Sequence, residues 1–209
     1  MILVAACFHA EMWWIPRRRG VRALRTPMGI SCAEALEREW GRVPDVSLLI
    51  STGFSGGVDP ELRVGDLLVA DLIRYRDEEV PIDPGLRERA RAGLEAAGVP
   101  HRIGPFASAD HVLTSGEKTT RSTTQGIAVD MESGPLASWA RDHGVAFLAL
   151  RAVLDPAERE LPFRAGRALW LSVLSHPLSS MRLAHSARIA GRSVGIGVGA
   201  LLDELGAEV

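Results

Sequence analysis

The sequence predicts an α/β protein with three layers, in which helices flank both faces of a central, mostly parallel mixed sheet. Short apolar runs rich in Val, Leu and Ile recur along the chain, as expected of strands that are buried on both faces. Segments with apolar residues at helical spacing alternate with these runs, and such alternation is typical of a parallel sheet. Because 209 residues can bury one such core, we expect a single domain over residues 1–209.

The individual elements follow from these patterns. The expected strands are the apolar runs Ile2–Cys7, Val46–Ile50, Leu67–Leu72, Ile127–Asp130 and Val145–Val153. The expected helices are Ser31–Trp40, Gly85–Ala97 and Glu132–His143. The last two helices are followed by Gly98 and Gly144, which suit helix C-caps. Residues 161–209 are expected to form a helical C-terminal extension of the same domain.

Composition excludes several classes of protein. With 46% hydrophobic and 24% charged residues, the chain resembles folded soluble proteins rather than disordered or membrane-spanning ones. A net charge of −2 argues against general nucleic-acid binding. Two cysteines are too few for a disulfide framework, and the histidines lack metal-site spacing, so we expect a cytoplasmic protein with no metal and no organic cofactor. The short apolar run Met1–Phe8 lacks a preceding basic region, so it is interpreted as a strand rather than a signal peptide.

The final segment has a different charge pattern. Between Leu161 and Leu202 there is no acidic residue, whereas five arginines are present: Arg164, Arg167, Arg182, Arg188 and Arg192. One interpretation is an ordinary packed terminal helix with a solvated basic stripe. The other is peripheral contact with an anionic bilayer, at the inner face of the membrane.

Three segments carry the candidate chemistry: Ser51–Gly57, Val129–Ser133 and Leu150–Asp155. The strand ending at Asp130, the helix from Glu132 and the strand of Val145–Val153 are interpreted as a right-handed crossover between parallel strands. Such a unit brings Glu132 and Asp155 to the carboxyl edge of the sheet, where α/β proteins bind ligands. Glu11 and the glycine-rich turn Ser51–Gly57 are expected at the same edge.

Two carboxyl groups in one crevice suit cleavage of a glycosidic bond. One can hold sugar hydroxyls while the other gives a proton to the departing group. We assign the second role to Asp155. An aspartic acid that remains protonated at neutral pH needs a raised pKa, which burial at the floor of a crevice can supply.

The same segments resemble the methylthioadenosine nucleosidase and purine nucleoside phosphorylase superfamily, from residue 1 to about residue 160. The likeness lies in Thr52–Gly57, Val64–Asp66, Val129–Glu132 and Arg151–Asp155. Within the superfamily, Asp155–Pro162, Lys118 and the arginine-bearing tail resemble the hopanoid-associated phosphorylases. The resemblance implies an enzyme that removes adenine from adenosylhopane and leaves a ribosyl hopanoid. The alternative within the superfamily is a methylthioadenosine/S-adenosylhomocysteine- or futalosine-type nucleosidase.

The resemblance also implies roles for single residues. Glu132 would bind the ribose hydroxyls, Met131 would pack against the sugar, Asp155 would act on the purine and Glu11 would activate water. The other substrate-binding residues that it implies are Met28, Gly29, Gly53, Phe54, Ser55, Gly56, Asp130 and Arg151. Phosphate is a second candidate for the nucleophile, so hydrolysis and phosphorolysis both stay open. A homo-oligomer is implied, and we expect a dimer.

Two residues depart from the superfamily pattern. Phe54 replaces a small polar residue, and Leu154 replaces the serine that commonly precedes the catalytic aspartate. Both changes make the site more apolar, which fits a lipid-linked nucleoside. They also remove hydrogen-bond partners from the position of the water or phosphate.

Each candidate residue also has a simpler interpretation. Glu132 suits the start of a helix, Asp155 before Pro156 suits a turn, Glu11 suits the surface and Met131 suits a core. The arginines at positions 17–19 are either phosphate ligands or part of a solvated loop. The functional interpretation is favoured because the candidates occur together at the ends of predicted strands.

Two other classes of function were weighed. Gly53–Gly57 fits the G-x-S-x-G pattern of serine hydrolases, with Ser55 as nucleophile and His176 or His185 completing a triad with Asp155. A nucleophile elbow must lead into a helix, whereas Val58–Asp66 indicates a loop into another strand. A non-catalytic nucleoside-binding protein is the other alternative, and the presence of Asp155 argues against it.

Overall fold

The computed structural model describes residues 1–41, 45–111, 126–156 and 177–207. The strands are β1 (Ile2–Ala6), β2 (Val21–Arg25), β3 (Leu48–Gly57), β4 (Leu67–Tyr75), β5 (Glu78–Pro81), β6 (His101–Ser108), β7 (Ala128–Asp130) and β8 (Ala146–Asp155). The helices are α1 (His9–Met12), α2 (Ser31–Trp40), α3 (Pro84–Ala96), α5 (Ser133–Asp142) and α7 (Pro177–Glu204). The three helices predicted within residues 31–143 are confirmed to within one residue at each end.

The strands form one mixed sheet, part of which closes on itself. β3 pairs in parallel with β8 and antiparallel with β7, while β4 pairs in parallel with β6 and antiparallel with β8. Parallel pairing of β6 with β7 completes a ring of five strands. β1 and β2 extend the sheet in parallel from β3, and β5 extends it from β4. The mostly parallel mixed sheet is therefore as predicted, whereas its partial closure into a barrel was not foreseen.

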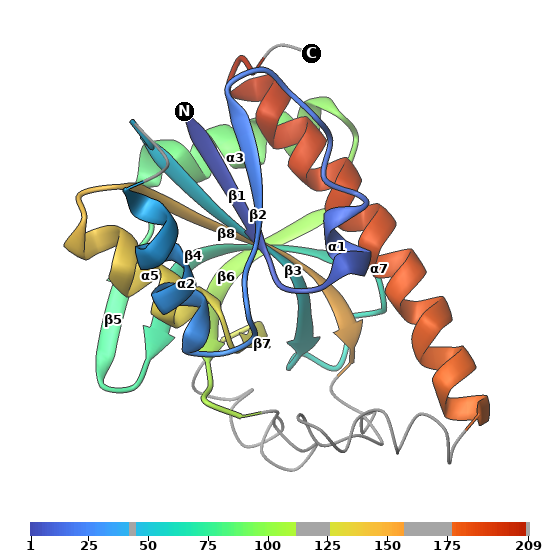
Figure 1. Cartoon of the computed structure of the whole chain (residues 1–209). Coiled ribbons are helices and arrows are strands. Elements are labelled where there is room, and N and C mark those ends of the chain that lie inside the picture. Colours follow the sequence, from blue (N-terminus) through green and yellow to red (C-terminus); the bar gives the residue numbers. More distant parts are fainter. Residues whose placement is uncertain (42–44, 112–125, 157–176, 208–209) are drawn as a thin grey trace.

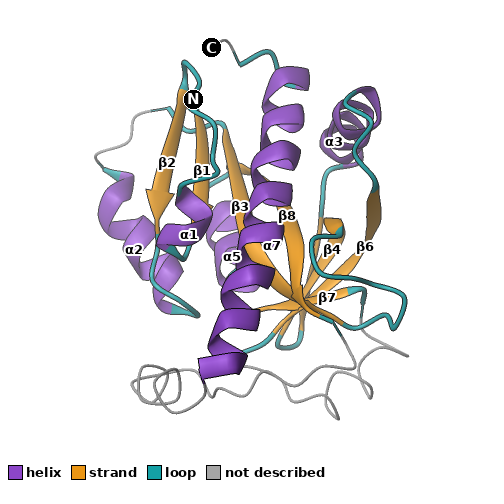
Figure 2. Cartoon of the chain, turned by 90° about the vertical axis from the view of Figure 1, so that its right-hand side faces the viewer, coloured by secondary structure: helices purple, strands orange, loops and turns teal. Residues whose placement is uncertain are grey.

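Helices cover both faces of this sheet (Figures 1 and 2). On one face α7 contacts β8, β3 and β4, and α3 and α1 pack beside α7. On the other face α5 contacts β8 and β4, and α2 packs against α5. The predicted three-layer α/β/α class is confirmed.

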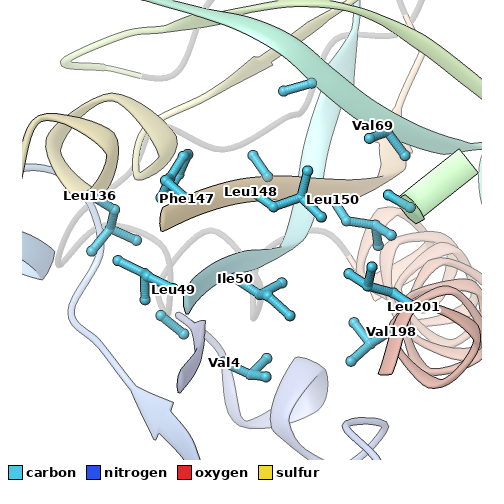
Figure 3. Packing of buried hydrophobic residues seen from close by; sticks show 14 of the residues in the cluster. Val4, Leu49, Ile50, Val69, Leu136, Phe147, Leu148, Leu150, Val198 and Leu201 are labelled. Carbon is cyan, nitrogen blue, oxygen red and sulfur yellow. The ribbon is translucent and has the colours of Figure 1, made fainter. Parts of the chain in front are cut away.

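The core lies on both sides of β3 and β8. Figure 3 shows Leu136 of α5 near Phe147 on one side of the sheet, and Leu201 of α7 near Leu150 on the other. All four side chains are buried. Strands that are covered on both faces need apolar side chains at successive positions, which explains the continuous apolar runs in the sequence.

Two predictions about the strands are wrong. Ser51–Gly57 is not a turn, because β3 continues through it to Gly57. Its glycines and serines have low strand propensity, but pairing with β8 and β7 supplies hydrogen bonds that hold the segment extended. The predicted parallel crossover is also wrong: β7 and β8 lie on either side of β3 and run in opposite directions.

In the part of the chain that the structure describes, no helix combines the length and the apolar character needed to cross a membrane. α7 instead carries arginines, and it packs on the sheet through buried residues of its later turns such as Val194 and Val198.

Candidate active site

A fully buried arginine, Arg151 in the middle of β8, organises the candidate site. Its Nε atom donates to Oδ2 of Asp130 at 2.8 Å. Its Nη1 and Nη2 atoms donate to the backbone oxygen of Thr52 at 2.8 Å and to the hydroxyl of Ser51 at 2.9 Å. Arg151 thereby ties together β3, β7 and β8 from inside the protein.

Three buried carboxyl groups surround this cation: Asp130, Glu132 and Glu11. Burial by itself would lower the pKa of Arg151, but the three carboxyl groups outweigh it and raise that pKa. Nη2 of Arg151 lies 3.7 Å from Oε2 of Glu132. A Cβ atom on Gly53 would lie 2.5 Å from Oε1 of Glu11 and 3.0 Å from Nη1 of Arg151, so both groups rest against the glycine backbone.

Asp130 has a positioning role. Its carboxylate accepts the backbone N–H of Ser133 at 3.2 Å and 3.3 Å, the Ser133 hydroxyl, and the Ser108 hydroxyl at 3.0 Å. It therefore caps α5 in addition to binding Arg151. Because protein donors engage both oxygens, this geometry suits orientation of Arg151 better than the predicted contact with substrate.

Glu132 stands at the start of α5, but its side chain does not cap that helix. Instead, Oε1 accepts the backbone N–H of Gly29 at 3.1 Å. Burial, with repulsion from Asp130 and Glu11, raises the pKa of Glu132 to about 7, although Arg151 and the Gly29 N–H oppose this shift. Glu132 therefore stands at a helix start, as its simple interpretation requires, but it also binds the loop before α2 and lies beside Arg151.

The loop before α2 reaches Glu132 through Gly29, one of the two loop residues predicted for the site. Gly29 has a φ of +69°, which favours glycine, and a Cβ atom there would lie 3.6 Å from the Cε atom of Met131. Met28 is 37% exposed. Met131 thus lies beside the loop that binds Glu132, rather than in an unrelated part of the core.

Glu11 is 1% exposed, so its interpretation as a surface charge is wrong. Oε2 accepts the backbone N–H groups of Cys7 at 2.8 Å and Phe8 at 2.7 Å, and Oε1 accepts that of Phe54 at 2.8 Å. Burial raises the pKa of Glu11, while these N–H groups and Arg151 partly offset the shift. The rings of Phe8 and Phe54 stack with centroids 6.5 Å apart beside this carboxyl group.

The short helix that carries Glu11 is fixed by the residues after it. A Cβ atom on Gly191 would lie 2.5 Å from Nε1 of Trp14, and one on Gly195 would lie 2.6 Å from the backbone oxygen of Trp14. These two glycines lie one turn apart on α7 and form a notch that receives Trp14. α7 thereby fixes the position of Glu11, a role that the sequence analysis missed.

Asp155 is the last residue of β8 and is 3% exposed, so it is not an exposed turn residue. It pairs with Gly56 of β3, which on its other side pairs with Val129 of β7. A register shift between Ser55 and Gly56 marks a bulge in this pairing, and bulges commonly re-aim a side chain next to a site. Asp155 and the segment leading to Glu132 therefore flank the same glycine, although the predicted parallel crossover is absent.

Comparison with known proteins gives the family. Residues 17–167 match the phosphorylase superfamily. The chain belongs to the phosphorylase superfamily. This membership confirms the predicted superfamily and the prediction of an enzyme.

Individual relatives agree with this assignment. A 5′-methylthioadenosine/S-adenosylhomocysteine nucleosidase of Baumannia cicadellinicola subsp. Homalodisca coagulata is 26% identical over 152 residues, which cover 63% of this chain and 66% of the relative. A structure from Borrelia burgdorferi B31, bound to adenine, has a TM-score of 0.78 at 15% identity and covers 97% of this chain and 99% of its own. Futalosine hydrolase of Helicobacter pylori strain 26695 has a TM-score of 0.73 at 16% identity, with 97% of both chains covered.

The serine-hydrolase alternative is wrong for this member of the superfamily. Ser55 lies inside β3, which continues to Gly57 and is followed by a loop into β4 rather than by a helix. Within the described part of the chain its buried hydroxyl has no hydrogen-bond partner. His185 is exposed on α7, and His176 lies outside the described residues.

Arg17, Arg18 and Arg19 do not reach the site. They precede β2, at the opposite end of that strand from the carboxyl edge, and Arg18 pairs with Asp203 of α7 at 3.1 Å. Their interpretation as phosphate ligands of this site is therefore wrong. Lys118 and residues 157–162, which suggested the hopanoid-associated subfamily, lie outside the described residues. Among the described residues, no group of three or more His, Cys, Asp or Glu side chains could hold a metal ion.

Proposed function

We propose that this protein cleaves the N-glycosidic bond of a purine nucleoside by hydrolysis and releases adenine. The observation that carries the proposal is the pair of buried acids, Glu11 and Glu132, that Arg151 holds in one site. The relatives described above, which include a 5′-methylthioadenosine/S-adenosylhomocysteine nucleosidase and a futalosine hydrolase, support the same reaction.

Each acid has a separate task in this proposal. Ionised Glu132 accepts hydrogen bonds from the ribose hydroxyls, and these bonds strengthen as positive charge develops on the sugar. Asp155 gives a proton to a ring nitrogen of the purine while the bond between the base and the sugar breaks. Glu11 takes a proton from the attacking water, whose oxygen forms the new bond to the sugar carbon.

The charges in the site favour water over phosphate. Three carboxyl groups, those of Glu11, Asp130 and Glu132, surround Arg151, the one guanidinium group that is buried among the described residues. Each nitrogen of Arg151 already donates to a protein oxygen. A phosphate dianion next to Glu11 would therefore meet repulsion from the carboxyl groups without a buried cation that has a free donor, whereas a neutral water would not.

The experiment that tests this function is adenine release by the purified protein. Methylthioadenosine, S-adenosylhomocysteine, futalosine and adenosylhopane are each supplied with and without phosphate, and the released base is quantified by chromatography. We expect release of the base without phosphate and no more than about twofold stimulation by it. A strict requirement for phosphate would overturn hydrolysis, and no release from any of these nucleosides would favour a non-catalytic nucleoside-binding protein.

Adenosylhopane is our proposed substrate among these. Phe54 is a half-buried apolar residue whose backbone N–H binds Glu11, and Phe8, which stacks on Phe54, is 42% exposed. This apolar rim suits a nucleoside whose 5′ carbon carries a hydrocarbon group. Turnover of methylthioadenosine alone would contradict the lipid-linked substrate and leave the nucleosidase proposal intact. A homodimer in the cytoplasm stays a prediction.

Substrate affinity should depend on pH through Glu132. Because its pKa is raised to about 7, the group is increasingly protonated below pH 7 and loses acceptor strength. We expect KM to rise by up to about tenfold for each pH unit below 7, with a smaller change in kcat. Measurement of KM between about pH 5 and pH 9 checks this expectation. Glu132→Gln should bind substrate weakly at every pH and should not show the rise of KM below pH 7. If Glu132→Gln showed the same rise of KM at acidic pH as the parent, that rise would come from the titration of another group.

The raised pKa of Glu132 also makes the free energy of unfolding depend on pH. Burial favours the protonated form of Glu132, so its contribution to folding is full below its ordinary pKa of 4.5 and is lost as the pH rises to about 7. Relative to the parent, Glu132→Gln should therefore gain stability over that pH window. Urea unfolding at both ends of the window measures this difference.

A further inference from the structure

We infer that the outer side of α7, together with Trp13, docks on an anionic lipid bilayer. Six side chains define this basic–apolar face: Trp13, Met181, Arg182, Arg188, Arg192 and Ile196. Trp13 is 85% exposed, Met181 71% and Ile196 47%, and the three arginines are exposed. The inference goes beyond the proposed reaction, because none of these residues belongs to the site described above.

The face is continuous because of helical geometry and one tight contact. Positions 181, 188, 192 and 196 recur at helical spacing, and the opposite side of α7 is buried in the core through Val194 and Val198. Trp14 fits the notch of Gly191 and Gly195, which places its neighbour Trp13 beside α7. Figure 2 looks onto this side, with α7 crossing in front of the sheet and α1 next to it.

The charge of the face points to an anionic partner. Residues 177–202 contain no acidic residue, although the whole chain has a net charge of −2. Arg182, Arg188 and Arg192 form no ion pair in the described part of the chain, unlike Arg91, Arg102 and Arg141 elsewhere on the surface, which all pair with acids. The positive charge of this face is therefore available to a partner.

The apolar residues identify that partner as a bilayer. The face combines a tryptophan at its boundary with arginines among aliphatic side chains, on a helix that has no acidic residue before Asp203. This composition is typical of helices that lie in a membrane interface. Nucleic acid would satisfy the arginines but would leave Met181 and Ile196 in water. A second copy of the chain would bring two faces of like charge together.

Vesicle flotation tests the docking. We expect the protein to float with vesicles of phosphatidylcholine and phosphatidylglycerol, and not with phosphatidylcholine alone. Arg188→Gln/Arg192→Gln should bind roughly 25-fold more weakly, since each basic residue near an anionic surface contributes about fivefold. The matched control, Arg38→Gln/Arg141→Gln, removes the same charge from the α2 and α5 layer and should bind within about twofold of the parent.

Fluorescence reports on the tryptophan separately. Anionic vesicles should shift the emission of the parent to shorter wavelength, and Trp13→Phe should abolish most of that shift. Equal loss of binding in the control double variant, or equal binding to neutral vesicles, would overturn the proposal. So would a change in oligomeric state caused by Arg188→Gln/Arg192→Gln, because the face would then be an interface between copies. Adenine release from a soluble nucleoside, followed in parallel, keeps this test independent of the proposed reaction.

Discussion

Replacing Asp155 by asparagine should lower kcat for adenine release by about 10²- to 10⁴-fold, while the protein still binds nucleoside. Asparagine has nearly the same shape as aspartic acid but cannot give a proton to the departing purine. Asp155 is buried at the end of β8, where this proton would be delivered. Single-turnover rates with saturating nucleoside measure the loss, and calorimetric titration measures the binding that should persist.

The matched control is Asp142→Asn, the same change at the exposed last residue of α5. Its kcat should equal that of the parent. If Asp155→Asn kept more than about a tenth of the parent kcat, the proton donor would have to be another group. If Asp155→Asn instead lost stability and binding together, Asp155 would be a structural residue.

Replacing Arg151 by methionine should destabilise the protein by about 3–5 kcal/mol, because Asp130, Glu132 and Glu11 would stay buried without their cation. Native domains are stable by about 5–15 kcal/mol, so much of the total would be lost. Urea unfolding at about pH 8, where all three acids are ionised in the unfolded chain, measures the change.

Arg141→Met is the control for this substitution. Arg141 pairs with Glu78 at 2.9 Å and Asp142 at 3.2 Å on the surface, where such pairs contribute at most about 1 kcal/mol. In addition, Arg151→Met/Asp130→Asn should be less destabilised than the sum of its single changes, because it removes one of the stranded carboxylates. Strict additivity, or equal losses for Arg151→Met and Arg141→Met, would contradict the central role of Arg151.

Apolar periodicity was enough to predict much of the fold. It located α2, α3 and α5 and the apolar cores of β1, β3, β4 and β8, because these elements are held by burial that is visible in the sequence. β2, β5 and β6 were missed, since segments such as His101–Ser108 contain glycine, proline and polar residues that suggest a loop. Such strands depend on hydrogen bonds from neighbours far along the chain, which local composition does not encode.

The candidate site, like the fold, was predicted only in part from the sequence. Glu11 and Glu132 were expected at one edge of the sheet because each follows a strand that the apolar pattern located, whereas Arg151 was assigned to the site only through the family resemblance. The hydroxyl groups of Ser108 and Ser133 that support Asp130 were not predicted, since serine is common in loops and carries no distinctive spacing. The direction of β7 was also beyond the sequence, because three paired residues are too few to show a pattern.

The notch on α7 has a consequence for how activity is acquired. Trp14 and Gly191 are separated by 177 positions, and their contact holds the helix that bears the proposed water-activating group. During synthesis α1 is translated early. The α7 residues that hold it, near position 195, are translated late and must dock before α1 is fixed in place. Catalytic turnover should therefore begin only after α7 has docked, because Glu11 would have no fixed position in a nascent or partly unfolded chain.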